Sequence, residues 1–292
     1  MSKGLVNWIL FVLLAITWGS SFILMKRGLD CFTSQEVASI RMFLAFLFML
    51  PFAFMHYKTA NLKKKWLPYA MVGLCGNLIP AFLFTKAQTG ISSSTAGILN
   101  ALTPLFVLLI AVVVYKNKFS RLNIIGILIG FAGALLLIMS NGNGTSSAKP
   151  ELGFLIVIAT ALYGVAVNVI RNYLQDQHHI AITAFAFCSV GPLVSVYMFS
   201  STEVVLKLQQ NTEALSCLGY LSILAFWGTA TAVMLYNYLI KQSTILFASS
   251  VTYAIPIVAV MWGLFDGEGL QTAQMLSIGI ILGGVYLVTK KG

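Results

Sequence analysis

The sequence predicts an all-α membrane protein in which ten transmembrane helices form two inverted five-helix repeats around a central cavity. Three observations predict this fold class: the composition, ten long apolar segments and an internal repeat. Of the 292 residues, 59% are hydrophobic and only 9% are charged. A soluble domain carries roughly 25% charged residues. The composition therefore excludes a cytosolic enzyme, a disordered chain and a disulfide scaffold.

The apolar segments define the expected elements. A helix that crosses a bilayer needs about 20 mostly apolar residues. Ten windows meet this requirement, at residues 5–25, 34–55, 66–86, 92–115, 121–140, 151–174, 180–200, 214–240, 244–265 and 272–289. Too few residues remain for a soluble domain, so we predict one integral membrane domain. The first window lacks a small-residue cleavage site and is too long for a signal peptide, which makes it a retained helix.

The distribution of Lys and Arg predicts the orientation. With the N-terminus inside, twelve of the 18 basic residues fall on the inner side and five on the outer side, while Arg41 lies within a span. The outer five are Lys26, Arg27, Lys86, Lys149 and Lys207. Because cytoplasmic loops are enriched in Lys and Arg, this bias predicts that both termini are cytoplasmic. The net charge of +10 then reflects topology, and no nucleic-acid partner is expected.

Parts of the two halves resemble each other. A shift of 152 residues places Ala96 on Ala248 and Pro104 on Pro256, and a shift larger by one residue places Gly126 on Gly279. We predict a first repeat at 1–143 and a second at 144–292, joined by the Gly-, Asn- and Ser-rich segment 141–147. Because each repeat has five spans, the second is inverted. Inverted repeats recur in secondary transporters, where exchange of the two repeat conformations gives alternating access to one site.

The fourth and ninth spans carry the first candidate site residues. Pro104 and Pro256 occupy matched positions, and each removes a backbone hydrogen bond near mid-membrane, so we predict a helix break or hinge at both. Thr252 and Tyr253 share a helix face with Pro256, and Asn100 lies on the matching face of the fourth span. These residues are predicted to line the cavity. The alternative is a simple kink with hydroxyls bonded to their own backbone.

Further polar and aromatic residues lie within other spans. Asn77 and Asn168 are too deep for lipid exposure to be favourable, so they either line the cavity or join helices by hydrogen bonds. Tyr163 and Tyr236 would supply flat walls for an organic solute, or else pack between helices. All four are candidate substrate-binding residues.

Arg41 is the one basic residue within a span. It lies about 10 Å inside the outer end of the second helix, given a rise of 1.5 Å per residue. It could attract an anionic or carboxylate group of a solute, or it could snorkel outward or pair with Asp30 or Glu36. We favour the structural role and retain Arg41 as a candidate binding residue.

Several kinds of chemistry have no residues to support them. All eight Asp and Glu residues fall in loops or at span ends, so coupling through a buried carboxylate is not expected. No catalytic motif is present, which argues against an enzyme. No metal site or cofactor is predicted, because the four cysteines lack ligand spacing. Cys31 and Cys217 both fall near the outer face, so a disulfide between them is possible but not required.

Several motifs together resemble the EamA-type members of the drug/metabolite transporter superfamily, including bacterial amino-acid and metabolite exporters. The similar residues are Trp18-Gly19-Ser20-Ser21-Phe22 with Lys26, Arg41 and Ala45, Phe82 to Pro104, Tyr236 to Pro256, and Gly267-Glu268-Gly269 with Gln274, Gly279, Gly283 and Gly284. They cover nearly the whole chain in the family's order. One departure is Lys116-Asn117-Lys118, where the family often has an acidic residue like Glu268.

The resemblance implies ten helices, a central cavity and movement of small metabolites, often outward. We therefore expect a secondary transporter of the cell membrane, of the bacterial inner-membrane type, that moves amino acids or similar metabolites by alternating access. A nucleotide-sugar or drug carrier of the same superfamily is the alternative, and a non-transporting membrane scaffold or receptor is a third hypothesis. The glycines of the fifth and tenth spans permit close packing within one chain. A monomer or weak homodimer is therefore expected, with solute and lipid as its partners.

Overall fold

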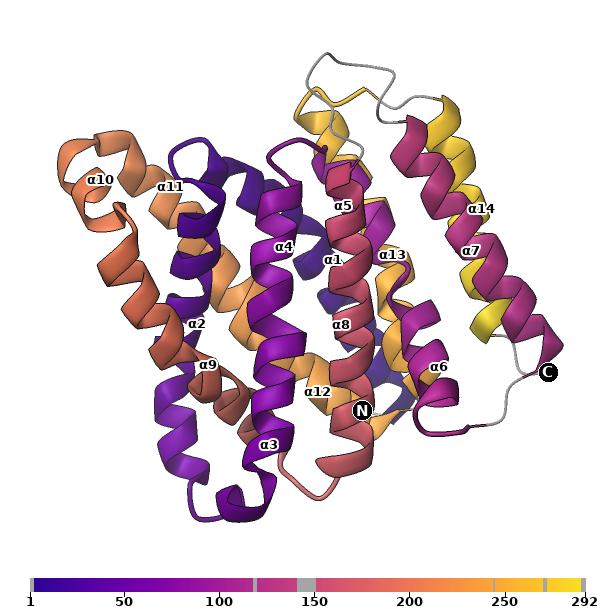
Figure 1. Cartoon of the computed structure of the whole chain (residues 1–292), viewed down its shortest axis with the longest axis horizontal. Coiled ribbons are helices and arrows are strands. Elements are labelled where there is room, and N and C mark those ends of the chain that lie inside the picture. The colour runs from indigo at the N-terminus through magenta and orange to yellow at the C-terminus, as the bar shows by residue number, and fades with distance from the viewer. Residues whose placement is uncertain (1–2, 118–119, 141–150, 244, 270–271, 290–292) are drawn as a thin grey trace.

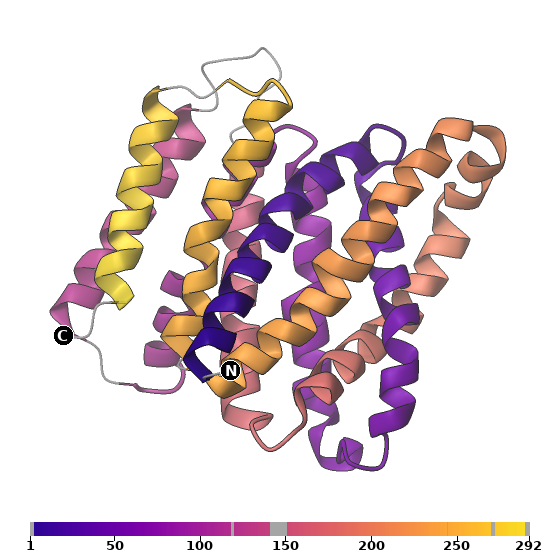
Figure 2. The same cartoon turned by 180° about the vertical axis from the view of Figure 1, so that it is seen from behind.

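The computed structural model describes residues 3–117, 120–140, 151–243, 245–269 and 272–289. The predicted boundary between repeats, at residue 143, lies outside these residues. The described chain is a bundle of helices without strands (Figures 1 and 2). The elements of the first half are α1 (Lys3–Leu29), α2 (Ser34–His56), α3 (Leu62–Gly73), η1 (Leu74–Leu78), α4 (Ile79–Ala87), α5 (Ser93–Asn100), α6 (Thr103–Val113) and α7 (Arg121–Ser140).

The second half follows the same order of spans, with one short helix added and with its fourth span formed by a single helix. Its elements are α8 (Glu151–Tyr173), α9 (His179–Ser201), α10 (Val204–Gln210), α11 (Thr212–Ile223), η3 (Leu224–Thr231), α12 (Ala232–Gln242), α13 (Ile245–Phe265) and α14 (Thr272–Thr289). In both halves the third span is therefore built from two α-helices joined end to end by a π-helical segment, η1 or η3. The added helix, α10, lies between the second and third spans of the second half.

The predicted spans agree closely with the observed helices. Nine helices of the described chain are long and apolar enough to cross a membrane, and a shorter apolar stretch, Gln274–Leu287, lies within α14. The all-α membrane fold is confirmed, while the count of ten spans and the cytoplasmic termini stay predictions. α1 begins and α14 ends toward the same end of the bundle, the lower one in Figure 1. We call the opposite end, where α1 ends and α2 begins, the upper end.

Large apolar side chains cover the outside of the bundle. Phe54, Met139 and Phe265 are 78%, 70% and 81% exposed. Exposed apolar surface on this scale is unfavourable in water but not in lipid. The interior is equally apolar, with Leu14 and Leu105 almost fully buried in two separate clusters. A layer of lipid-facing helices therefore surrounds a packed interior.

The two matched prolines behave differently. The fourth span is interrupted between α5 and α6, and Pro104 lies in the first turn of α6, where its missing N–H leaves no intrahelical bond unmade. By contrast, α13 continues through Pro256 without interruption. The helix is therefore not broken at Pro256 in this conformation, and a hinge at this residue stays a prediction. A proline removes one hydrogen bond, which the remaining turns of a packed helix can tolerate.

Candidate central cavity

A cavity of about 120 Å³ lies in the middle of the bundle. A water needs roughly 10–15 Å³ measured in this way, so the cavity could hold on the order of ten water-sized groups. The first four spans of the first half contribute to its wall, as do the first, third and fourth spans of the second half, whereas α9 contributes no lining residue. The lining residues are Trp18, Ser21, Phe22, Met25, Arg41, Met42, Val72, Gly76, Asn77, Phe84, Asn100, Thr103, Tyr163, Ala166, Val167, Ile170, Thr229, Val233, Tyr236, Asn237 and Thr252.

Seven lining residues of the first half have a lining counterpart in the second half. The α1 residues that line the cavity recur on α8 after a constant shift of 145 residues, as Trp18 with Tyr163 and Met25 with Ile170, and likewise for the two residues between them. A shift of 152 residues relates Asn77 to Thr229, Phe84 to Tyr236 and Asn100 to Thr252. The cavity thus lies where the two halves meet, each contributing an equivalent surface.

Two pairs of aromatic residues line the cavity, and the shifts of 145 and 152 residues relate one pair to the other. Trp18 and Tyr236 pack edge to face with ring centroids 5.0 Å apart. Phe84 and Tyr163 are stacked with centroids 6.0 Å apart. Aromatic rings in such pairs hold one another in place while one face stays free for a solute. Both predicted tyrosines therefore line the cavity, each with a partner from the other half of the chain.

The π-helical segments place one polar residue each at the cavity wall. In η1, Asn77 Nδ2 donates to the Val72 carbonyl, 3.2 Å away, and in η3, Thr229 Oγ1 donates to the Leu224 carbonyl, 2.9 Å away. Both bonds run from a residue to the fifth residue before it. The Trp18 indole N–H donates to the Gly228 carbonyl at 3.1 Å and so occupies a carbonyl of η3. Short π-helical segments within α-helices are frequent at functional sites.

Arg41 extends from α2 to the cavity, where its Nε donates to Thr229 Oγ1 at 2.7 Å. The two acids considered as its partners are engaged elsewhere. Asp30 pairs with Arg27 at 3.7 Å, and Glu36 pairs with Lys207 at 2.6 Å. The predicted pairing of Arg41 with Asp30 or Glu36 is therefore wrong, because both carboxylates lie at the upper end of the bundle while the guanidinium points to its middle.

Asn100 and Thr252 line the cavity as expected, and their polar atoms are used differently. Thr252 Oγ1 donates to the Ser249 carbonyl at 2.8 Å, which satisfies it locally. Asn100 is 8% exposed, and its Oδ1 is buried without a hydrogen-bond partner in the described part of the chain. Buried acceptors are nearly always paired in proteins, so this oxygen is available to accept a hydrogen bond from a molecule in the cavity.

Two candidates do not line the cavity. Asn168 is buried between α8 and α6, where its Nδ2 lies 2.9 Å from the carbonyls of Val107 and Gly164. It therefore joins helices, the alternative considered for it. Tyr253 lies on the face of α13 toward α14, and its hydroxyl donates to the Val285 carbonyl at 3.4 Å.

Sequence reasoning missed Thr229 and Trp18 as parts of the site. The internal repeat could have identified Thr229. The shift of 152 residues that relates the halves places Gly76-Asn77 on Gly228-Thr229. Trp18 belonged to the family motif, but no polarity pattern marked its side chain as facing inward.

A cluster of charges surrounds Glu268, in the connection between α13 and α14 at the upper end. Glu268 accepts hydrogen bonds at the start of α5 from the Ser93 and Ser94 backbone N–H groups, at 3.0 and 3.1 Å, and from Ser94 Oγ at 2.7 Å. Lys26 Nζ lies 3.0 Å from Glu268 and 2.5 Å from Asp266, which also pairs with Arg27. We call these residues the Glu268 cluster.

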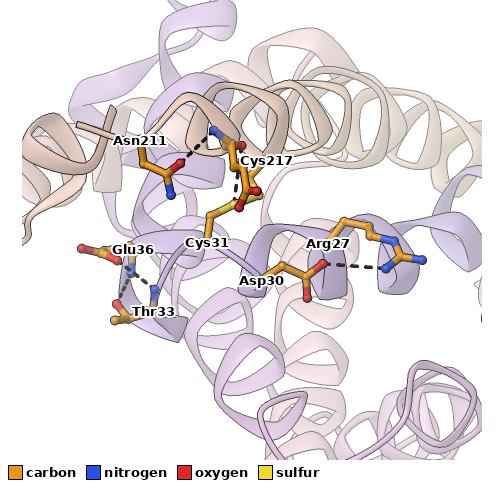
Figure 3. Close-up of a disulfide and its surroundings, with 8 residues drawn as sticks. Arg27, Asp30, Cys31, Thr33, Glu36, Asn211 and Cys217 are labelled. Atoms are coloured by element: carbon orange, nitrogen blue, oxygen red, sulfur yellow. Dashed lines mark hydrogen bonds and ion pairs between the residues drawn. A yellow bond between two sulfur atoms is a disulfide. The ribbon is translucent and has the colours of Figure 1, made fainter. Parts of the chain in front are cut away.

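A disulfide joins the two halves at the same end (Figure 3). Cys31, in the α1–α2 connection, is bonded to Cys217 on α11, and their Cα atoms are 6.3 Å apart. Beside it, Thr33 and Glu36 form a reciprocal capping box that begins α2, and Asn211 Oδ1 accepts from the Glu213 N–H at 2.9 Å to begin α11. Both cysteine-bearing segments are therefore held by local hydrogen bonds as well as by the covalent bond.

A bundle of membrane-length apolar helices around a cavity between two equivalent halves defines a multi-pass membrane transporter. The model of the EamA-like transporter family matches the chain at residues 6–139 and 152–290. The chain therefore belongs to the EamA-like transporter family, within the drug/metabolite transporter superfamily, and is a protein of the cell membrane.

Individual relatives agree with this assignment. The uncharacterized inner membrane transporter YedA of Escherichia coli K12 is 27% identical over 278 residues, which cover 94% of this chain and 88% of that protein. A probable amino-acid metabolite efflux pump of Salmonella typhimurium is 21% identical, with 95% and 93% of the two chains covered. A solved crystal structure with 14% identity superposes with a TM-score of 0.66 over 98% of this chain and 96% of the other. That likeness concerns the fold alone.

Proposed function

We propose that the chain is a secondary transporter that exports small organic metabolites of amino-acid size and chemistry by alternating access to the central cavity. The single observation that supports this best is the cavity wall, to which the two halves contribute residues in matched positions. Equivalent surfaces allow the two repeats to exchange conformations around one site. The name of the Salmonella relative adds support for amino-acid metabolites and for efflux.

The residues proposed to contact solute are Asn77, Asn100, Tyr163, Tyr236 and Thr252, with Arg41. Their neutral polar and aromatic groups suit a weakly polar or zwitterionic solute, whereas a nucleotide sugar would need several clustered basic groups for its phosphates. Transport without a coupling ion, or exchange of one metabolite for another, is the proposed mode. No Asp, Glu or His is among the described residues that line the cavity, and proton-driven carriers commonly use such a group.

A counterflow screen tests the function. Proteoliposomes preloaded with one unlabelled amino acid or metabolite should accumulate the same labelled compound transiently and saturably. A scaffold or receptor would show no saturable movement of any solute. If uptake is lost when a pH gradient is dissipated, while the solute gradient is held constant, the proposed mode would be overturned.

Two substitutions locate the site. Asn100→Leu and Thr252→Leu should each reduce counterflow at least tenfold, on the order of the loss when a binding residue is misplaced by about 1 Å, because each fills the cavity with an apolar branch. Asn117→Leu makes the same change at an exposed position after α6 and should leave flux unchanged. Comparable amounts of folded protein are confirmed by size-exclusion chromatography. Unchanged kinetics in both site variants would remove these residues from the site.

A further inference from the structure

The polar groups of the cavity are distributed unequally between the halves, although the wall itself is nearly symmetric. Thr229 accepts a hydrogen bond from Arg41 at 2.7 Å, whereas its counterpart Asn77 has no such basic partner among the described residues. Arg41 is also the one basic residue among the described residues that line the cavity. One pole of the cavity is therefore cationic, while the remainder is aromatic, aliphatic or neutral polar.

The charge of Arg41 is not balanced by the protein. Within the described chain, the one hydrogen bond of its side chain runs from Nε to a neutral hydroxyl, and its other electrostatic neighbour is the phenol of Tyr163, not a carboxylate. Three of the carboxylates at the upper end are paired with other bases, Glu36 with Lys207 and Asp266 and Glu268 with Lys26. A charged group far from bulk water is unfavourable unless it is paired. The outer edge of the guanidinium, with two nitrogens in a planar fork, has the geometry that matches a carboxylate.

A second polar atom of the cavity also lacks a partner. Asn100 Oδ1 is buried and accepts no hydrogen bond in the described part of the chain. It is an acceptor without charge, so it suits a donor such as an amine or amide N–H rather than a second anion. The cavity thus offers a cationic donor at Arg41, a neutral acceptor at Asn100, and two aromatic walls around the space that both residues line.

We infer that the cavity selects solutes that carry one carboxylate, bound by Arg41, together with an N–H donor, bound by Asn100, and a compact apolar group between the aromatic pairs. This inference rests on the proposed function and specifies its substrate class. A solute whose carboxylate is replaced by an uncharged amide leaves the guanidinium unpaired, and a solute with an extra cationic group meets no described carboxylate in the cavity. Arg41 then determines specificity by charge.

The test compares matched pairs of compounds that differ in the carboxylate alone. Leucine and leucinamide, and phenylalanine and phenylalaninamide, are each added to the purified full-length protein in detergent, and the dissociation constant is obtained from the rise in Tm with concentration. Wild-type protein should bind the carboxylate member of a pair at least about tenfold more tightly than the amide, as expected for a desolvated charge pair. Arg41→Gln should reduce this ratio to near one.

Three variants separate recognition from a structural role. Arg41→Lys keeps the charge and should retain part of the preference, whereas Thr229→Val keeps the charge but releases Nε and should weaken binding of the carboxylate. Arg171→Gln makes the same Arg-to-Gln change as Arg41→Gln, but at an exposed position on α8, and this variant should bind like wild type. Should Arg41→Gln not fold, the comparison of Arg41→Lys with Thr229→Val carries the test.

A fourth variant tests the contact of Asn100 with the amine. Asn100→Ala should weaken the binding of leucine relative to that of 4-methylpentanoate, which lacks the amine.

The outcomes distinguish this inference from the proposed function. A carboxylate preference that depends on Arg41, in a protein without counterflow of any amino acid, would support the site and refute transport of amino acids. Counterflow in wild type with equal competition by acid and amide, or with an unchanged ratio in Arg41→Gln, would overturn the inference and leave the transporter intact. Absence of any measurable preference in the binding assay would also overturn it.

Discussion

Glu268 joins three parts of the fold through one carboxylate. It accepts hydrogen bonds from the start of α5, lies in the connection after α13, and pairs with Lys26 on α1. Burial by itself raises the pKa of Glu268, but the hydrogen bonds from Ser94, Lys26 and Ser93 outweigh burial and lower the pKa below its ordinary value. The shift of 152 residues places Lys116, not an acid, at the corresponding position of the first half. The Glu268 cluster is thus a feature of the upper end alone.

The lowered pKa of Glu268 makes the stability of the upper end dependent on pH. A carboxyl whose pKa is lowered in the folded state stabilises the protein at pH values above its pKa in the unfolded chain. This stabilisation is lost as the pH falls through its pKa in the folded protein. The Tm in detergent should therefore decrease as pH is lowered from about 6 to about 3, in the range where carboxyls titrate. Glu268→Gln should lower the Tm at neutral pH and flatten that dependence.

Glu213→Gln, a change at an exposed acid on α11, serves as the matched control. Its pH profile should follow that of the wild type. A Glu268→Gln profile parallel to the wild-type profile would show that other groups cause the acid sensitivity.

At this scale the sequence predicted residue types better than residue partners. Asn100, Thr252 and Tyr163 were recognised because polar groups in a span must be sheltered from lipid, and that rule holds whatever the neighbours are. The same rule cannot say which sheltered group faces a cavity and which faces another helix, so both possibilities stayed open for Asn168, and Tyr253 was expected at the cavity although it packs toward α14. Arg41 could not be paired correctly because Thr229 is 188 residues away in the chain.

Among the elements, α7 and α14 form the closest helix pair and lie side by side at one edge of the bundle (Figures 1 and 2). A Cβ added to Gly284 would lie 2.5 Å from the Gly130 backbone nitrogen and 2.6 Å from the Gly126 carbonyl oxygen. A Cβ added to the neighbouring Gly283 would have no other atom within 4 Å. The two helix backbones therefore touch at Gly284, where no side chain can fit without separating them.

Two alanine substitutions at adjacent positions test this contact. Gly284→Ala should destabilise the protein by about 1–3 kcal/mol, the usual cost of overpacking a rigid contact. Gly283→Ala should be neutral or stabilise by about 0.4–1 kcal/mol, because it restricts the unfolded chain and meets nothing in the folded one. Thermal or denaturant unfolding in detergent measures both, and equal effects of the two changes would contradict a close contact at Gly284.

Hydropathy predicted the spans to within about four residues at each end, since length and polarity in a bilayer leave few alternatives. It could not predict the π-helical segments η1 and η3, because the extra residue in a π-turn leaves the apolar pattern nearly unchanged. It also overestimated Pro256, whose equivalence with Pro104 in sequence did not carry over to the backbone. Sequence symmetry fixes which residues correspond, while packing decides whether corresponding helices bend.

For the molecule as a whole, the basic residues predicted to lie outside differ from those predicted inside. Lys26, Arg27 and Lys207 at the upper end are all in ion pairs with acids. Among the described bases of the opposite end, Lys65 pairs with Asp176, while the structure gives Lys58, Lys63 and Lys64 no ion pair. Lys86, which is also predicted to lie outside, has no ion pair among the described residues. The orientation with inner termini therefore stays a prediction that rests on the numbers of Lys and Arg on each side.

The disulfide bears on the same question, because such bonds form in oxidising compartments and are rare in the cytosol. A bond between Cys31 and Cys217 is therefore expected where the upper end faces outward.

The disulfide also keeps the two halves joined after any cut in the chain between them. With a protease site placed in segment 141–147, cleavage should leave one band on a non-reducing denaturing gel and two after reduction, and two bands without reductant would show that the bond is absent. A nicked chain joined in this way would remain a single molecule whose two halves can be isotopically labelled or mutated separately and then reunited by oxidation.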